Sequence, residues 1–282
     1  MTAAPLLPPM AGRERLRAYA GVTRVVSRTL FVYRSNFIVN AFGLLMQVYL
    51  LRVVWAAVFP PSGHTVSGGH VITLGSQIAY STLATVQFSL FSPWQVSMVP
   101  QRVRDGTIAI DLARPISFNS QMLAWQLGST LGNAPFALLA LPFAVLVGGA
   151  QLPASAGAGL EYAVSLVLGY LLAVLLGALM GMVAFWTLEI QGILLIYLMI
   201  SRFLAGALVP LWFMPGWLRD IAQWLPFQGT TYTPVAVYLG QLGGTRAVLA
   251  AIAAQAVWVV ALSLLLWVVC RRALRRVTVQ GG

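Results

Sequence analysis

The sequence predicts an all-α integral membrane protein with six transmembrane helices, an N-terminal interfacial amphipathic helix and a broken, re-entrant outer hairpin between spans five and six. Three observations predict this class: a composition poor in charge, six long apolar segments, and arginines that gather beside alternate segments. Of the 282 residues, 59% are hydrophobic and 8% are charged. Soluble domains are roughly 25% charged. The composition therefore argues against a soluble enzyme, because so few charges could not cover its surface.

The basic residues exclude several kinds of chemistry. All 17 are arginine, and the chain contains no lysine. A P-loop needs a lysine on the phosphates and Schiff-base catalysis needs a lysine amine, so neither belongs to this chain. If the protein uses ATP, another chain must bind it. The net charge of +11 does not predict a nucleic-acid partner, because the arginines lie at the edges of apolar segments. The single cysteine, Cys270, excludes an internal disulfide.

Six segments are long and apolar enough to cross a bilayer, whose core of about 30 Å needs about 20 apolar residues per helix. The predicted spans cover approximately residues 36–59, 71–99, 121–147, 161–185, 190–212 and 246–270. They divide the chain into a cytoplasmic N-terminal region (1–35) with the interfacial helix, a transmembrane domain (36–270) and a basic cytoplasmic tail (271–282).

The positions of the arginines predict the orientation. Thirteen of the 17 lie on one side of the predicted spans. They are Arg13, Arg15, Arg17, Arg24, Arg28, Arg34, Arg102, Arg104, Arg114, Arg271, Arg272, Arg275 and Arg276. Arg219 and Arg246 lie on the other side, and Arg52 and Arg202 fall within spans. Cytoplasmic loops carry the excess of basic residues, so we expect both termini in the cytoplasm.

The first helical segment is amphipathic. Its apolar residues recur at intervals of three and four, which places them on one face: Leu16, Tyr19, Val22, Val26, Leu30 and Tyr33. Arg13, Arg17, Arg24 and Arg28 gather on the opposite face. Such a helix is typical of one that lies in the membrane interface. The alternative is a cytosolic helix packed on a partner.

The loop between spans two and three, residues 100–118, is the most charged internal stretch. Its charged residues are Arg102, Arg104, Asp105, Asp111 and Arg114, and Gly106 and Pro115 punctuate it. Mixed charge beside Ile108 and Ile110 favours a docking element for a cytosolic protein. The alternative is a solvated turn that only fixes the topology.

The outer segment 208–242 combines proline with tryptophan. It contains Pro210, Pro215, Pro226 and Pro234, together with Trp212, Trp217 and Trp224. Proline interrupts spanning helices, whereas tryptophan favours the membrane interface. Short broken helices that dip back from the outer surface satisfy both preferences, which predicts an outer gate. An ordinary extracellular loop is the alternative.

Polar residues inside the spans are candidates for a translocation path. Arg202 lies near the middle of the predicted fifth span, where an arginine is costly and usually faces protein or water. Arg52 is close enough to the outer end of its span to reach the interface. Gln47 and Gln87 also enter spans, although each amide can instead bond a neighbouring helix. Glu189 indicates a tight cytoplasmic turn between spans four and five.

The sequence shows no catalytic constellation and no metal site. His64 and His70 share a Gly/Ser-rich loop without a neighbouring carboxylate or cysteine. The predicted spans carry no acid near the midplane, as proton- or sodium-coupled transport usually requires. This argues for an external energy source.

Three local patterns carry a family resemblance. They are residues 104–115 (RDGTIAIDLARP), residues 185–189 (FWTLE), and the segment from Ala205 through Trp217 followed by Leu225-Pro226-Phe227 and Pro234. With the six spans and the N-terminal helix, they make the chain resemble the membrane subunits of ABC exporters of the ABC-2 type. The subgroup that it most resembles includes drug and viologen exporters. Arg202 departs from the pattern, where an uncharged residue is expected.

The resemblance implies a non-catalytic permease of the bacterial inner membrane that exports a hydrophobic or amphiphilic small molecule. Its partners would be two ATPase subunits, which bind ATP and magnesium, a second permease, identical or paralogous, and membrane lipids. Residues 102–114 would be the coupling element, and spans one, two and five would line the path. The gate residues would be Gly206, Pro210, Pro215, Trp217, Pro226 and Phe227. A gradient-driven transporter or channel, a non-transporting scaffold and, more remotely, a membrane enzyme are the alternatives.

Overall fold

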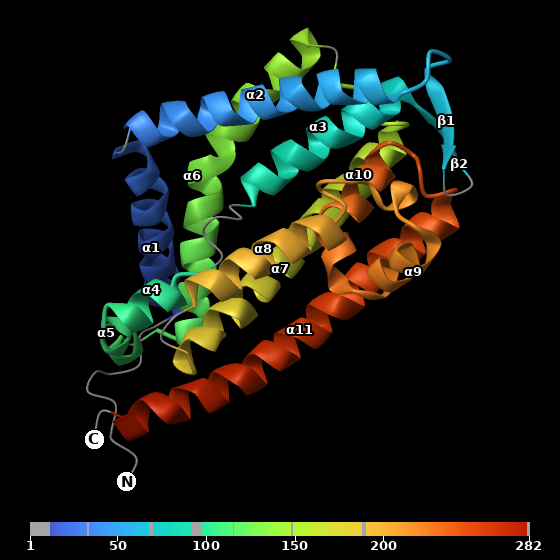
Figure 1. Cartoon of the computed structure of the whole chain (residues 1–282). Helices are drawn as coiled ribbons and strands as arrows, with labels where there is room; N and C mark the ends of the chain where they lie inside the picture. Colours follow the sequence, from blue (N-terminus) through green and yellow to red (C-terminus); the bar gives the residue numbers. More distant parts are fainter. Residues whose placement is uncertain are drawn as a thin grey trace.

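The computed structural model describes residues 12–32, 34–67, 70–91, 97–114, 116–147, 149–187 and 190–280. This part of the chain is almost entirely helical (Figure 1). The longer helices are α1 (Gly12–Val32), α2 (Arg34–Val58), α3 (Leu74–Leu90), α6 (Phe118–Leu146), α7 (Ala156–Met182), α8 (Gln191–Leu204) and α11 (Thr245–Gln280). The short elements are β1 (His64–Ser67), β2 (His70–Thr73), α4 (Val99–Arg104), α5 (Ile108–Ala113), η1 (Val183–Phe185), η2 (Leu211–Phe213), α9 (Gly216–Trp224), η3 (Pro226–Thr230) and α10 (Tyr232–Tyr238).

Four described helices are long and apolar enough to cross a membrane, judged by length and composition. These segments are 38–58, 118–146, 156–185 and 245–273, which correspond to predicted spans one, three, four and six. Helix α8 is apolar but has only 14 residues. An all-α membrane protein is therefore confirmed, whereas a count of six spans remains a prediction.

The second and fifth predicted spans are shorter than expected. Span two was predicted over 71–99, but α3 has 17 residues and rises about 26 Å at 1.5 Å per residue. Its start is fixed by Thr73, whose side chain and that of Ser76 form a reciprocal capping box. Span five was predicted over 190–212, but α8 ends at Leu204, and Gly206 at φ +74° reverses the chain. Arg202 therefore lies in the last turn of a helix, not in its middle.

The segment with both histidines forms a β-hairpin instead of the predicted loop. β1 and β2 pair antiparallel, with His64 opposite Thr73 and Ser67 opposite His70. Among the described residues, no group of three His, Cys, Asp or Glu side chains is arranged to hold a metal ion.

Helix α1 packs along the first half of α6, as Figure 1 shows. The Thr23 hydroxyl donates a hydrogen bond to the carbonyl of Ala124 (2.9 Å). One turn earlier, a hydrogen bond with the Ser120 hydroxyl lowers the pKa of Tyr19. One turn later, the backbone of Gly128 lies against Val26. Because these contacts advance together, the two helices run in the same direction. Tyr19 and Val26 of the predicted apolar face therefore pack on the chain's own α6, whereas Leu16 of that face is 69% exposed. A place in the membrane interface remains a prediction.

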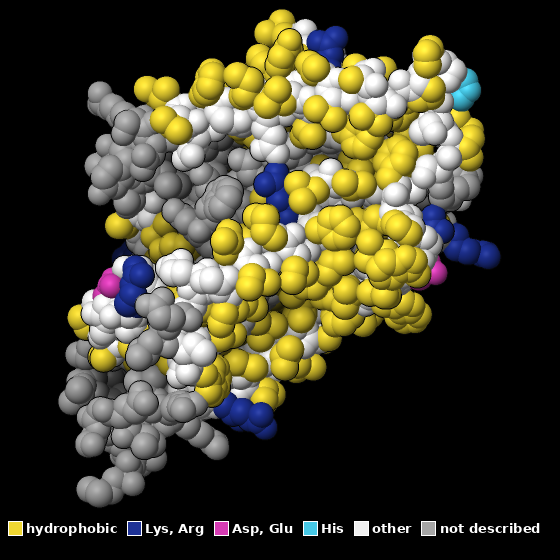
Figure 2. Space-filling model, in the orientation of Figure 1, with side chains coloured by type: hydrophobic (Ala, Val, Ile, Leu, Met, Phe, Trp, Pro, Cys, Tyr) yellow, Lys and Arg dark blue, Asp and Glu magenta, His cyan; other side chains and the backbone are white. Residues whose placement is uncertain are grey.

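The arginine-rich segments gather at one end of the molecule. In Figure 1 the start of α1, the α4–α5 segment and the last part of α11 lie at this end, whereas β1, β2, α9 and α10 lie at the other. A cluster of buried apolar side chains joins α4, α5, α6, α7 and α11 at the arginine-rich end. A second cluster at the opposite end joins Phe59, Tyr80, Trp212 and Val235. The exposed side chains are largely apolar over the face in Figure 2, as a lipid-facing surface requires.

We expect the substitution Gly128→Ala to separate α1 from α6. A Cβ at Gly128 would lie 2.7 Å from the Thr23 carbonyl oxygen and 2.8 Å from the Val26 Cβ. Overpacking of this kind costs about 1–3 kcal/mol, so the melting temperature of the purified chain in detergent should fall by several degrees. Gly21→Ala is the control, because nothing lies within 4 Å of its Cβ position. Equal melting temperatures for the two variants would contradict the packing.

Candidate functional site

The α4–α5 element, residues 99–114, is organised around one buried carboxylate. Asp111 is only 1% exposed. Its carboxylate lies 3.5 Å from the Arg102 Nε and 3.5 Å from the Arg114 Nη1. The Gln121 amide of α6 donates hydrogen bonds to the backbone carbonyls of Asp111 (2.8 Å) and Ile116 (3.1 Å). These contacts tie α4, α5 and the start of α6 into one unit.

The element rests on the ends of the long helices. Val99 and Ile108 are buried in the cluster that also contains Met122 of α6, Met182 of α7 and Ala273 of α11. Gly181 of α7 lies directly against the side chain of Ser97, so that a Cβ there would collide with it. A force applied to the element therefore reaches three helices through direct contacts.

The outer face of the element mixes charge with apolar surface. The Gln101 amide donates to both carboxylate oxygens of Asp105 (3.0 and 2.8 Å) and its carbonyl accepts from Arg104. Ile110 of the same element is 61% exposed. Gly106, at φ +68°, makes the turn between α4 and α5, where other residues would be strained. This face offers an apolar contact framed by both signs of charge.

The structure thus separates the predicted coupling residues into two groups. Arg102, Asp111 and Arg114 meet in the internal ion pairs, which hold the element together. Arg104 and Asp105 face outward, where they can contact another molecule. Pro115 and the turn residue Glu189 lie outside the described residues.

The segment predicted as an outer hairpin, here called the hairpin, follows α8 and is held by α3. The Tyr80 hydroxyl donates to the carbonyl of Gly206 (2.9 Å), and the Trp212 indole donates to the side chain of Gln77 (3.3 Å). The hydroxyl of Ser67 in β1 donates to the Trp212 carbonyl. A glycine is required at position 206 for two reasons. Its φ of +74° would strain other residues, and a Cβ would lie 2.8 Å from Leu211 and 2.9 Å from the Tyr80 hydroxyl.

The second part of the hairpin reaches the middle of α7. Gly169, at the midpoint of α7, approaches the hairpin so closely that a Cβ would lie 2.8 Å from the Gly229 carbonyl oxygen. The Gln87 amide donates to the Thr230 carbonyl (2.6 Å), and the Gln255 amide donates to the Gly229 carbonyl (2.7 Å). Amide side chains from α3 and α11 therefore satisfy two carbonyls at the end of the short helix η3.

The predicted gate residues occupy different environments. Gly206, Pro210 and Pro226 are buried, and Phe227 lines a cavity. Pro215 is exposed at the start of α9, and Trp217 is 67% exposed. Trp217 shares one exposed face of α9 with Ile221 and Trp224, which is 82% exposed.

The predicted path residues do not form one cluster. Gln87 is buried and ties α3 to the hairpin. Gln47 is partly exposed on α2. The Arg202 guanidinium lies over the ring of Phe88, 4.8 Å from its centroid. Of the three, Arg202 retains the strongest case for a ligand contact.

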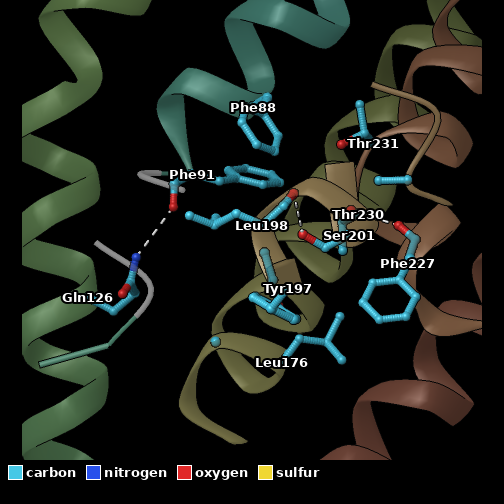
Figure 3. A pocket seen from close by; sticks show the side chains of 13 residues that line it. Phe88, Phe91, Gln126, Leu176, Tyr197, Leu198, Ser201, Phe227, Thr230 and Thr231 are labelled. Carbon is cyan, nitrogen blue, oxygen red and sulfur yellow. Dashed lines mark hydrogen bonds between the residues drawn. The ribbon is translucent and has the colours of Figure 1, made fainter. Parts of the chain in front are cut away.

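A cavity of about 60 Å³ separates α3, α7, α8 and η3 (Figure 3). Its walls are mostly aromatic and aliphatic, including Phe88, Phe91, Tyr197, Leu198 and Phe227. Ser201 faces it but donates its hydroxyl to the Leu198 carbonyl (3.1 Å). A larger cavity of about 680 Å³ lies beside α4 and the start of α8. Leu198 lines both, so the two cavities adjoin.

Sequence reasoning missed several residues that hold this arrangement. The Ser165 hydroxyl donates to the Gln255 side chain (2.8 Å) and joins α7 to α11. Gln121 and Tyr80 have comparable roles. In the sequence, each of these residues is a polar side chain within an apolar segment. Such a side chain indicates that a hydrogen bond is made, but it does not identify the partner.

We expect Asp111→Asn to loosen the α4–α5 element by leaving two arginines without their counter-charge. Breaking a fully buried pair costs about 3–5 kcal/mol, and about 1–3 kcal/mol is expected here because both arginines are partly exposed. Limited proteolysis within residues 99–114 should accelerate. Asp105→Asn, at an exposed position, is the control. Equal cleavage rates in the two variants would show that the ion pairs do not hold the element.

The comparisons with known proteins agree with this architecture. The family model described as ABC-2 family transporter protein matches residues 44–281, which includes all of the elements from α3 to the described end of α11. No curated protein matches the chain. Since the family match covers well over half of the sequence, the chain belongs to the ABC-2 family of membrane transporter proteins.

Proposed function

We propose that this ABC-2 permease exports a hydrophobic or amphiphilic small molecule, driven by two separate ATPase subunits that bind ATP and magnesium. The observation that carries the proposal is the α4–α5 element. It is held internally by Asp111, exposes Ile110 and contacts the ends of α6, α7 and α11. An ATPase docked there can move three long helices together. The lack of lysine supports placing the nucleotide chemistry on a partner chain.

In this proposal the arginine-rich end faces the cytoplasm of a bacterium and the α9 end faces outward. The positive-inside rule supports this orientation. Exposed Trp217 and Trp224 on α9 suit the outward-facing interface of the inner membrane, since tryptophan is enriched at membrane–water interfaces. The prolines of the outer hairpin suit a re-entrant gate, because its backbone is buried against protein.

The proposal includes a second permease, identical or paralogous. Support comes from α2 and α8, which present apolar side chains outward. Among the described residues of α8, none is buried. Ile38, Phe42 and Val54 of α2 are each more than half exposed. A second subunit against α2 and α8 would close a path lined by α2, α3 and α8.

The first test disrupts docking. Ile110→Arg should abolish copurification of the tagged permease with its ATPase and should reduce ATP-driven export at least several-fold. The variant places an uncompensated charge in the centre of the apolar contact. Val66→Arg is the control, because Val66 is similarly exposed, on β1 at the opposite end. Normal copurification and export by Ile110→Arg would refute the coupling assignment. Export that continues after the ATPase loses its catalytic residue would instead favour a gradient-driven transporter.

The second test disrupts the proposed gate. Gly206→Ala should lower export more than it lowers assembly with the ATPase, because its Cβ would collide with Leu211 and Tyr80. Gly243→Ala is the matched control, since Gly243 has a similar φ of +77° and no atom within 4 Å. Both substitutions cost about 1–2 kcal/mol of left-handed strain, and only Gly206→Ala adds a steric conflict. The gate assignment fails if both variants export equally well.

A further inference from the structure

The guanidinium of Arg202 contacts an aromatic ring. It lies over the Phe88 ring, 4.8 Å from the centroid. A cation–π contact does not consume the N–H donors of a guanidinium, because the aromatic ring offers no oxygen or nitrogen acceptor. The ring therefore positions the charge without accepting a conventional hydrogen bond.

The described part of the chain provides no acceptor for the Arg202 Nε. This nitrogen is buried and has no hydrogen-bond partner there. The backbone carbonyls nearby are already engaged: those of Ser201, Arg202 and Phe203 accept from Ala205 (2.8 Å), Ala207 (3.1 Å) and Gly206 (3.0 Å). Arg202 therefore does not cap its own helix. The ion pairs in the described residues both involve Asp111 of the α4–α5 element.

A chain of contacts through Phe88, Gln87 and Thr230 connects Arg202 to the middle of α7. Phe88 follows Gln87, whose amide bonds the Thr230 carbonyl. The segment Gly229–Thr230 packs against Gly169, the midpoint of α7. If α7 crosses the bilayer, an arginine at this level costs at least about 2.5–3.5 kcal/mol. A buried donor without a partner adds to that cost, so a ligand that supplies an acceptor would gain affinity here.

The surroundings specify more than an anion. Phe88 contacts Arg202 and also lines the 60 Å³ cavity, together with Phe91, Tyr197 and Leu198 (Figure 3). Through Leu198 this cavity adjoins the 680 Å³ cavity beside α4. Phe88 thus connects the Arg202 cation to one apolar cavity, and Leu198 connects this cavity to a second one beside α4.

We propose that Arg202 binds the anionic group, a phosphate or carboxylate, of an amphiphile whose apolar part occupies these adjoining cavities. The guanidinium fork suits both anions, because each presents two oxygens to its parallel N–H groups. This inference rests on the proposed export function and names its substrate class. Arg52 is not expected to bind this anionic group, because it is exposed on α2.

The experiment measures binding to the full-length permease, purified with its ATPase in an uncharged maltoside detergent. Equilibrium dialysis compares radiolabelled dodecyl phosphate with dodecyltrimethylammonium, which has the same chain and the opposite charge. The wild type should bind dodecyl phosphate saturably and at least about tenfold more tightly, as one charge-assisted contact provides. Arg202→Gln should remove this preference. Arg202→Lys should keep part of it, and Arg52→Gln should leave it unchanged.

Competition identifies the source of the anion. Displacement of dodecyl phosphate by phosphatidylglycerol assigns a membrane lipid, and failure of the lipid to compete assigns a soluble amphiphile. Displacement by equimolar inorganic phosphate would refute the apolar part of the proposal. Equal losses in Arg202→Gln and Arg52→Gln would also overturn it, by showing a general charge effect.

The wild-type comparison decides the matter even if Arg202→Gln does not fold, because equal binding of the two probes refutes the site. The outcome is also separate from that of the proposed function. ATP-driven export without anion preference refutes only this inference. Anion binding that depends on Arg202, in a permease that no ATPase drives, refutes only the export function.

Discussion

The structure depends on satisfying the backbone of a broken segment inside an apolar molecule. Between α8 and α11 the chain forms short helices and turns, whose carbonyls would be costly to bury without donors. Gln87, Gln255 and Tyr80 donate to the carbonyls of Thr230, Gly229 and Gly206. These donors come from α3 and α11, so the hairpin requires both neighbours to be in place. The polar residues in α3 thus serve the hairpin, at the cost of making α3 less apolar than the long helices.

Charge is used differently at the other end. In the α4–α5 element a single aspartate neutralises two arginines and is itself removed from solvent. Arg104 and Asp105 are bridged by Gln101 on the exposed face. The same short element therefore contains a buried set of ion pairs and an exposed charged surface. The two sets are separate because their side chains lie on different sides of the six-residue helices α4 and α5.

Much of the fold could be predicted from the sequence because long apolar runs have few alternatives. The positions of α2, α6 and α7 follow from hydropathy alone, to within several residues at their ends, and so does the start of α11, which continues beyond the predicted end to Gln280. The early end of α8 could not be predicted in this way, since residues 205–212 are as apolar as the helix before them. What ends α8 is a glycine turn packed against Leu211 and against Tyr80, which belongs to a distant part of the chain.

The candidate site was less predictable for the same reason. The charged loop could be recognised, but the distinction between Asp111 inside and Asp105 outside depends on tertiary packing. Gln87 could line a path or bond a neighbour, because an amide in an apolar run indicates a polar contact of any kind. The structure shows its bond to Thr230, and its place in a path remains a prediction. Arg202 could be identified as unusual, whereas its aromatic support by Phe88 required the structure.

Helix α7 meets both specialised regions through glycine. Gly181, near its C-terminal end, lies against Ser97 just before α4, and Gly169, at its midpoint, lies against the carbonyls of the hairpin. The two positions are 12 residues apart, or about 18 Å along the axis. Contacts without an intervening side chain allow little relative movement. Helix α7 can therefore transmit motion along its length: a tilt of its C-terminal end, at Gly181, displaces the hairpin at Gly169 without a change in any loop.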